Sequence, residues 1–251
     1  GSWVPHIPLA KERLDVGPGV FGLALLAIAA GAVTAMPLTG AMINRYGSSR
    51  VSLVTGALFC IAFAGPVTAP TLVPFIIMGY LLGALIGSMD VAMNAHGIAV
   101  ERKLKSPIMS MLHGGFSVGG MVGAFLGAWA LQHMDEFTHI ALAGAACLIL
   151  LFIAVRFLLP RSIDKGLSDT HFGWPTRATI GLGLLCFLAL MAEGSVLDWS
   201  AIYFTAEFKV DAGTAGLGYA FFSGGMAASR FTGDWLRQKF GAVPMVVASA
   251  L

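Results

Sequence analysis

The sequence predicts an all-α membrane protein, on the strength of its composition, the length of its apolar stretches and the placement of its basic residues. Of the 251 residues, 57% are hydrophobic and only 11% are charged. Soluble domains carry about 25% charged residues. A soluble core of this size cannot hide so much apolar surface, so the excess is expected to face lipid. The net charge of +2 gives no sign of nucleic-acid binding.

Seven apolar stretches are candidates for membrane-spanning helices. A helix needs about 20 residues to cross about 30 Å of hydrocarbon, and each stretch approaches this length with few internal charges. The second is the shortest and is expected to extend toward Pro70. Richness in Ala, Leu and Gly favours helices over a β-barrel. The predicted spans are Gly19–Ile43, Val51–Pro66, Leu72–His96, Met109–Leu131, Thr138–Leu159, Thr179–Val196 and Ala215–Thr232.

The basic residues predict the orientation. Of the 15 Lys and Arg residues, only Lys11, Arg13 and Lys209 fall on one set of loops and span ends, and all others fall on the opposite set. Because cytoplasmic loops are enriched in Lys and Arg, the basic set is expected to be cytoplasmic. The resulting sides alternate correctly across all seven spans.

An internal repeat indicates two related halves. Trp3 and Trp199 begin similar segments 196 positions apart, and Asp15 pairs with Asp211 at the same offset. Each copy continues into an apolar span and ends in a basic turn, NRYG at 44–47 and RQKFG at 237–241, where the offset is 194. In the second copy a span precedes the tryptophan. We therefore expect the complete protein to contain roughly 390–400 residues and about 12 spans.

The expected organisation places an N-terminal bundle at 1–160, a polar cytoplasmic linker at 161–178, and the start of a C-terminal bundle at 179–251. On this interpretation the chain is a fragment of two six-helix bundles, which lacks most of helix 1 and helices 9–12.

These features resemble the major facilitator superfamily, which has two six-helix halves and a basic turn after the second helix of each half. The family motif Gly-x-x-x-Asp-Arg-x-Gly resembles Gly40-Ala-Met-Ile-Asn44-Arg45-Tyr-Gly47, with Arg50 as a following basic residue. Asn44 replaces the family's aspartate. A looser copy in the second half contains Arg230, Asp234 and Gly241. The resemblance implies that both segments act as a conformational latch, in which the sequence also predicts an i, i+4 bridge between Arg230 and Asp234.

The segment Asp90-Val-Ala-Met-Asn94-Ala-His96-Gly97 resembles the Glu-x-x-x-Asn-Pro segment of fucose-permease-like sugar:proton symporters. A carboxylate at the bilayer centre costs about 2.5–3.5 kcal/mol, and no basic residue lies in the same predicted span. Asn94 is one turn later on the same face, where its amide can bond a solute or the carboxyl group. We expect Asp90 and Asn94 to face a central cavity and Asp90 to exchange protons.

Two further residues are candidates for proton coupling or substrate binding. Glu193 is the second acidic residue within a predicted span, and His113 opens another span and titrates near neutral pH. Structural roles remain open for both residues. On the span of His113, four glycines spaced by four predict a flat stripe for close helix packing. These are Gly115, Gly119, Gly123 and Gly127.

The predicted function is secondary active transport of a small polar solute with proton coupling by alternating access, and the resemblance to fucose-permease-like symporters implies a sugar-like solute. The alternative is a drug or metabolite exporter of the same fold. No catalytic set at a shared depth and no metal-binding pattern occurs in the sequence, so we expect neither an enzyme nor a cofactor. The expected setting is the bacterial inner membrane, with a monomeric protein whose partners are the solute, protons and lipid.

Overall fold

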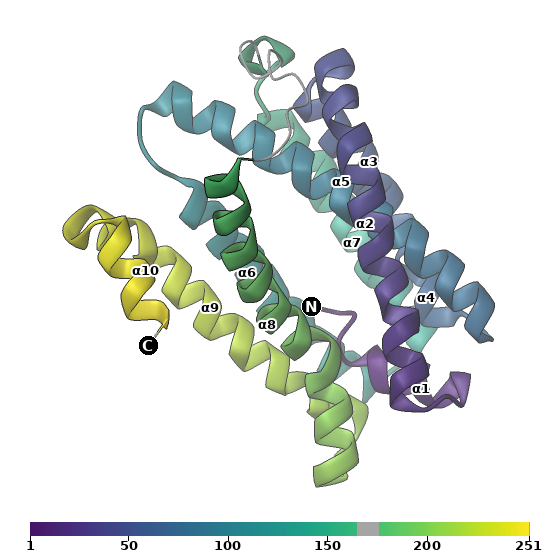
Figure 1. Cartoon of the computed structure of the whole chain (residues 1–251). Coiled ribbons are helices and arrows are strands. Elements are labelled where there is room, and N and C mark those ends of the chain that lie inside the picture. The colour runs from purple at the N-terminus through teal and green to yellow at the C-terminus, as the bar shows by residue number, and fades with distance from the viewer. Residues whose placement is uncertain (165–175, 251) are drawn as a thin grey trace.

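A computed structural model describes residues 1–164 and 176–250, which form helices and contain no strand (Figure 1). The chain folds into long helices that run between two ends of the molecule, joined by short connections. The helices are α1 (His6–Leu14), α2 (Pro18–Tyr46), α3 (Ser48–Ala62), α4 (Ala64–Thr68), α5 (Leu72–Leu104), α6 (Met109–Leu131), α7 (Glu136–Ala154), η1 (Val155–Phe157), η2 (Arg161–Asp164), α8 (Arg177–Phe208), α9 (Ala212–Phe240) and α10 (Ala242–Ala250).

Six helical segments in the described part of the chain are long and apolar enough to cross a membrane, which confirms a multi-pass all-α membrane protein. The second runs through α3 and α4 as Ser48–Thr68, as its expected extension toward Pro70 requires. The seventh predicted span forms α9, but α9 is not among the six. Its buried face consists largely of Gly, Ala and Ser, which pack against α6 and lower the apolarity of the helix.

The helix α8 is longer than the sequence predicted at both ends. It begins at Arg177, inside the predicted linker, and ends at Phe208. Trp199 therefore lies within the helix rather than at its end, with its ring against Gly22 of α2. The predicted linker is described only at its two ends, since residues 165–175 lie outside the described residues.

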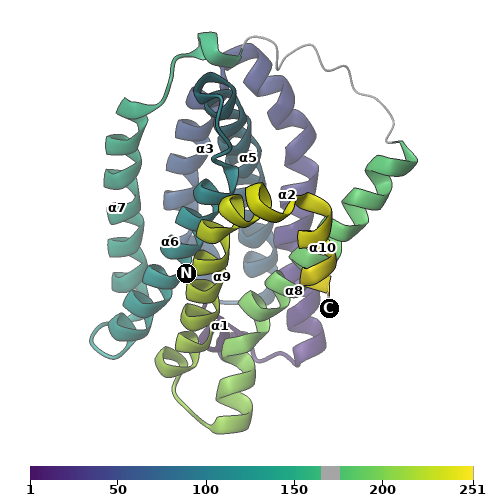
Figure 2. The ribbon, with the colours of Figure 1, turned by 90° about the vertical axis from the view of Figure 1, so that its left-hand side faces the viewer.

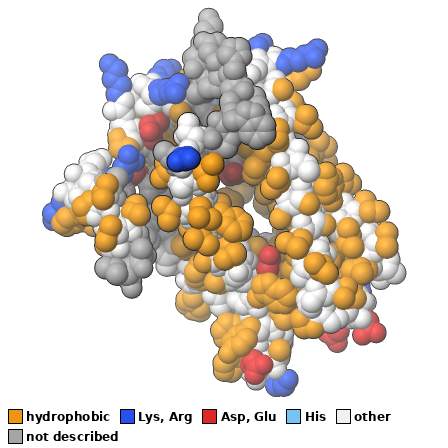
Figure 3. All heavy atoms as spheres, in the orientation of Figure 1, with side chains coloured by type: hydrophobic (Ala, Val, Ile, Leu, Met, Phe, Trp, Pro, Cys, Tyr) orange, Lys and Arg blue, Asp and Glu red, His pale blue; other side chains and the backbone are white. Residues whose placement is uncertain are grey.

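Charge is distributed unequally between the two ends of the molecule. Figure 3 shows Lys and Arg side chains gathered around the end where α2 and α3 meet, with fewer at the end that carries α1. This agrees with the predicted orientation, and we refer to the basic end as the inner end and to the α1 end as the outer end.

Helices α2 and α5 pack closely because glycines remove the side chains between them. A Cβ at Gly31 would lie 2.0 Å from the carbonyl oxygen of Tyr80, and a Cβ at Gly83 would lie 1.9 Å from that of Ile28. Gly87 is similarly close to Ala32. Backbones that approach this closely gain dispersion contacts, which drive helix association where lipid removes the hydrophobic effect.

Helices α6 and α9 form the second extensive helix pair, but the predicted glycine stripe is only partly used (Figure 2). A Cβ at Gly115 or Gly119 would meet nothing within 4 Å among the described residues, while Gly123 and Gly127 contact the segment that begins with Ser2. A spacing of four exceeds 3.6 residues per turn, so such a stripe drifts around the helix. The face that meets α9 instead includes Gly114, Ser117, Gly120 and Ala124.

The internal repeat is visible in α2 and α9. Both contain 29 residues, and both end at a glycine with positive φ, 90° at Gly47 and 84° at Gly241. Only glycine adopts this conformation without strain. Equivalent ends of α2 and α9 lie 194 positions apart, so the offset between the two copies changes from 196 to 194 before these helices begin. The sequence alone placed this change further along the copies, because glycines near the start of each copy also match at an offset of 196.

The packing of α2 on α5 yields a stability prediction. Replacement of Gly83 by Ala places a methyl group on the Ile28 carbonyl, so the helices must separate. We expect Gly83→Ala to lower the melting temperature of the purified full-length protein in detergent, measured by intrinsic fluorescence. Gly119→Ala is the matched control, because a methyl group there meets no described residue within 4 Å and Ala is the better helix former. Equal melting temperatures for the two variants would contradict the packing argument.

Candidate functional site

Asp90 lies near the middle of α5 and is held by the residue one turn later. The Asn94 amide nitrogen donates to Oδ1 of Asp90 at 3.0 Å and to its backbone carbonyl at 2.9 Å. Of the two partners expected for the Asn94 amide, a solute or the carboxyl group, the structure shows the carboxyl group. Within the described residues, no Lys, Arg or His forms an ion pair with Asp90, so no cation fixes this carboxyl group in its charged state.

The position of Asp90 on α5 determines which helices lie near its side chain. Asp90 follows Gly83 by seven residues, which is about two helical turns, so the two residues lie near the same line along α5. Near this level, the α5 residues that contact α2 are Ser88, which bonds to Thr39, and Ala92, which packs with Ile43. Both Asp90 and Asn94 are half-buried. Figure 3 shows a hollow between α8 and the helices of the first half, with acidic side chains inside it. That Asp90 faces a central cavity in the complete protein remains a prediction.

Glu193, the second predicted site residue, is part of an ion pair. Its Oε2 accepts a hydrogen bond from Nη2 of Arg230 at 2.9 Å, and the two side chains are 24% and 22% exposed. Glu193 lies in the middle of α8 and Arg230 two thirds of the way along α9. Each charge therefore offsets the other in a region where an isolated charge is costly.

This ion pair corrects the prediction that Arg230 pairs with Asp234. Side chains on a helix tilt toward its N-terminus, so the long Arg230 side chain extends away from Asp234 and toward Glu193. Asp234 forms no ion pair with another described residue. The i, i+4 spacing was a valid local signal, but contact between α8 and α9 supplied a partner that the spacing could not show.

The guanidinium of Arg230 also joins the two halves. Its Nη1 donates to Oγ of Ser117 on α6 at 2.5 Å and to the backbone carbonyl of His113 at 3.5 Å. Ser223 of α9 donates back to the Ser117 carbonyl at 2.8 Å. The predicted site residue His113 thus contributes its backbone, and its ring forms no hydrogen bond with the described residues.

The first-half latch segment ends at the inner end of α2. Arg161 of η2 donates to the Asn44 carbonyl at 2.9 Å, so Asn44 contributes its backbone to this contact. The Arg45 guanidinium lies over the ring of Tyr46, 5.3 Å from its centroid. Gly40 would tolerate a Cβ without contact, and Arg50 is exposed.

A buried polar network holds this turn, and the sequence did not reveal it. Asp164 of η2 accepts from the Ser48 backbone N–H at 2.9 Å and from its hydroxyl at 2.7 Å. It thereby satisfies an N–H at the start of α3, where such groups lack helical partners. His96 Nε2 accepts from the Leu159 N–H at 3.2 Å, which leaves Nδ1 to donate to the Ser48 hydroxyl at 2.8 Å.

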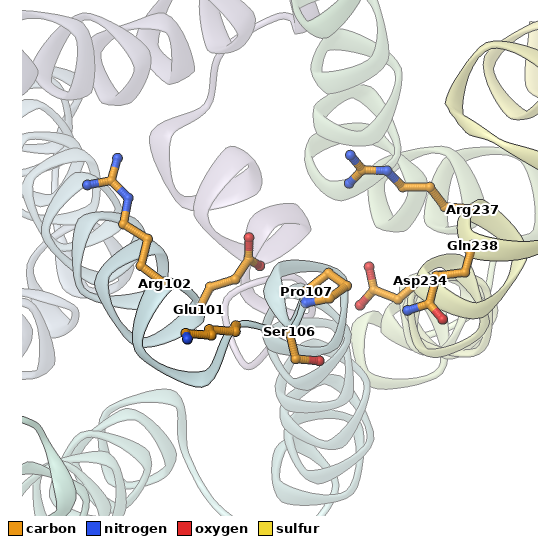
Figure 4. A pocket seen from close by; sticks show the side chains of 8 residues that line it. Glu101, Arg102, Ser106, Pro107, Asp234, Arg237 and Gln238 are labelled. Atoms are coloured by element: carbon orange, nitrogen blue, oxygen red, sulfur yellow. The ribbon is translucent and has the colours of Figure 1, made fainter.

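The second-half latch segment borders a charged cavity of about 440 Å³ at the inner end (Figure 4). Asp234, Arg237 and Gln238 of α9 line one side, and the connection from α5 to α6 lines the other. Glu101 accepts from the N–H groups of Ile108 and Met109 at 2.8 and 3.2 Å and so caps the start of α6. The cavity therefore lies between α9 and the first half.

No metal or cofactor site emerges from the described residues. None of their His, Cys, Asp and Glu side chains gather in threes around a possible metal position. The cysteines Cys60, Cys147 and Cys186 are free.

The buried network of Ser48, Asp164 and His96 could be recognised in the sequence only from the polarity of these residues near the ends of predicted spans. Many residues without such a role share that property.

The chain was compared with known proteins. The family model of the Major Facilitator Superfamily matches residues 3–251. The chain is 34% identical to an uncharacterized MFS-type transporter of Yersinia pestis. This match uses 100% of the chain and covers 65% of that protein. It is 29% identical to an uncharacterized transporter of Sinorhizobium fredii and 30% identical to the membrane protein MosC of Rhizobium meliloti. These two matches use 96% and 99% of the chain and cover 65% and 61% of the relatives. The chain thus spans less than two thirds of these relatives, and no solved structure matches it.

The ion pair between Glu193 and Arg230 yields a second prediction. Glu193→Gln leaves the Arg230 charge without its partner, and we expect a loss of about 1–3 kcal/mol in unfolding free energy. Adding Arg230→Gln to that variant should restore part of the loss, because no unpaired charge then remains. Thermal unfolding of the full-length protein measures both.

Asp234→Asn is the control for this comparison, since Asp234 forms no ion pair with Arg230. It should unfold close to the wild-type temperature. If Asp234→Asn were as destabilising as Glu193→Gln, the assignment of the ion pair would be wrong.

Proposed function

Because the chain belongs to the Major Facilitator Superfamily, we propose that the whole protein is a secondary active transporter that moves a small polar solute together with protons. This family comprises transporters, not enzymes. The proposed mechanism is alternating access, in which two bundles rock around a central site. On this view residues 1–160 belong to the first bundle, 161–178 to the linker and 179–251 to the second bundle. We place the protein as a monomer in a bacterial inner membrane.

The observation that carries the proposal is the state of Asp90. It is a half-buried carboxyl group within a spanning helix, bonded to Asn94 and without a cationic partner among the described residues. A group of this kind is neutral when sealed from water and loses its proton when a water-filled path opens. That behaviour is what a proton-coupling residue requires.

Glu193 fits this role less well. Its carboxylate is paired with the Arg230 guanidinium at 2.9 Å. We therefore assign proton exchange to Asp90 and place Asn94 beside the solute. The ion pair and Ser117 then serve as a contact between the halves. The inference of a sugar-like solute rests on the resemblance of residues 90–97 to fucose-permease-like symporters.

The latch segments support the same mechanism. Both follow the second helix of their half, and both turn at a glycine with positive φ. In the first half, Arg161 and Asp164 of η2 form hydrogen bonds with Asn44 and Ser48. In the second half, Asp234 lines the cavity at the inner end. We propose that these contacts break and re-form as the inner end opens and closes.

Asp90→Asn in the full-length protein tests the proposal. In de-energised cells, sugars and sugar acids are added one at a time while a pH electrode records the medium. We expect alkalinisation with a transported solute for wild type and none for the variant. Because neutral Asn resembles the protonated carboxyl, solute exchange across the membrane should persist in Asp90→Asn while uphill accumulation is lost.

Asp90→Glu is the matched control, since it keeps a titratable group and should keep a pH response. An unchanged response in Asp90→Asn would remove Asp90 from the coupling path. Solute movement outward against its gradient, with protons entering, would instead favour the exporter alternative.

A further inference from the structure

Four side chains form a polar cluster at the outer end, outside the region described above. His6 of α1 is fully buried, and its Nε2 lies 2.8 Å from Nδ1 of His139 on α7, which is 5% exposed. The other nitrogen of His6, Nδ1, lies 3.3 Å from Oε2 of Glu136. Arg13 of α1 donates to Oε1 of Glu136 at 2.5 Å and also to the carbonyl of Val67.

The hydrogen bonds determine where the protons lie when both imidazoles are neutral. The ionised Glu136 carboxylate only accepts, so His6 donates to it through Nδ1–H. Its Nε2 then carries a lone pair and accepts from the Nδ1–H of His139. The cluster is thus a chain, Glu136–His6–His139, in which every bond is satisfied.

One added proton leaves this chain intact. His6 becomes an imidazolium that donates to Glu136 and to His139, while His139 changes tautomer and holds its own proton on Nε2. A second proton cannot be accommodated in the same way. Both facing nitrogens, His6 Nε2 and His139 Nδ1, would then carry hydrogens at 2.8 Å, and two positive rings would repel each other.

The charged groups around the pair do not relieve this repulsion. Glu136 supplies one negative charge, which it already shares with Arg13. On α6, Gly127 lies next to the His139 ring. On α4, the Val67 carbonyl accepts a hydrogen bond from Arg13. No further acidic side chain forms an ion pair with the cluster among the described residues.

The cluster anchors a segment that touches both halves of the molecule. A buried apolar cluster contains Trp3, Ile7 and Ala10 together with Phe21, Phe75 and Ile140 of the first half.

The same segment also contacts the second half. Pro5 packs against Gly216 of α9 as well as against Gly127 of α6. Val4 packs with Ala201 and Ala215 of α8 and α9. The outer ends of the two halves therefore meet across residues 3–10.

We propose that His6, His139 and Glu136 form a proton-binding site that keeps the outer end closed, and that a second proton on the histidine pair releases α1 and opens it. The ligand is the proton, and the site is separate from Asp90. The inference rests on the proposed alternating access only for its role in transport. The pH-dependent release of α1 itself requires no solute.

The experiment measures how readily a thiol reagent reaches the buried face of α1 in the full-length protein. Cys60, Cys147 and Cys186 are first replaced by Ser, and Ala10→Cys, at a site that is 0% exposed, reports on opening. The protein is held in nanodiscs, whose two faces are open to the reagent. Labelling is recorded between about pH 8 and about pH 4, a range that extends below the ordinary histidine range because the second proton must join two rings that repel each other. Each rate is divided by that of Glu12→Cys, an exposed site on the same helix, to cancel the pH dependence of the thiol.

We expect this ratio to rise several-fold on acidification. His139→Asn should abolish the rise, because its amide can either donate to His6 or accept from it and takes up no proton. His133→Asn is the matched control. His133 is an exposed histidine at the same end, bonded to the Trp129 carbonyl of its own helix terminus, and its loss should leave the wild-type response.

A ratio that stays constant with pH would overturn the proposal, and so would a wild-type response in His139→Asn. This outcome is distinguishable from a failure of the proposed function. Labelling needs neither solute nor Asp90, so Asp90→Asn should keep the response even if it transports nothing.

Discussion

The absence of water from the hydrocarbon core is the constraint on which this structure depends. Backbone groups find no solvent partner there, so the chain satisfies them within helices, and polar side chains must find partners within reach. Glu193 and Arg230 solve this by neutralising each other across α8 and α9. Asp90 solves it differently, with an amide partner on its own helix and no ion pair among the described residues. The two acidic residues therefore have different kinds of partner.

Close packing and polar chemistry support each other in this fold. Gly31, Gly83 and Gly87 let α2 and α5 approach until backbone meets backbone. On α6, the small residues that meet α9 leave room for Ser117 to receive the Arg230 guanidinium. Larger residues at these positions would separate the helices and leave the polar groups without partners. Helix contact and charge pairing are therefore a single arrangement rather than two independent features.

Local patterns predicted some of these features and failed for others, for identifiable reasons. Six of the seven predicted spans, the basic end and the nearness of Asn94 to Asp90 depend on composition and on spacing within one helix, and local patterns predicted them. The glycine stripe was partly wrong, because a spacing of four drifts around a helix and only Gly123 and Gly127 remain in contact. The Arg230–Asp234 pair was wrong because α8 brought a better placed acidic group.

The sequence by itself determined that the chain crosses a membrane as helices, which end is basic, and that two halves share a repeated pattern. These properties follow from hydropathy, charge and repetition along the chain, which need no knowledge of what lies beside each helix. The tertiary structure alone decided the partners of each polar group. His6 and His139 are 133 positions apart, and Ser48 and Asp164 are 116 apart. Hydrogen bonds act over about 3 Å, so only the packing of helices could bring such pairs together.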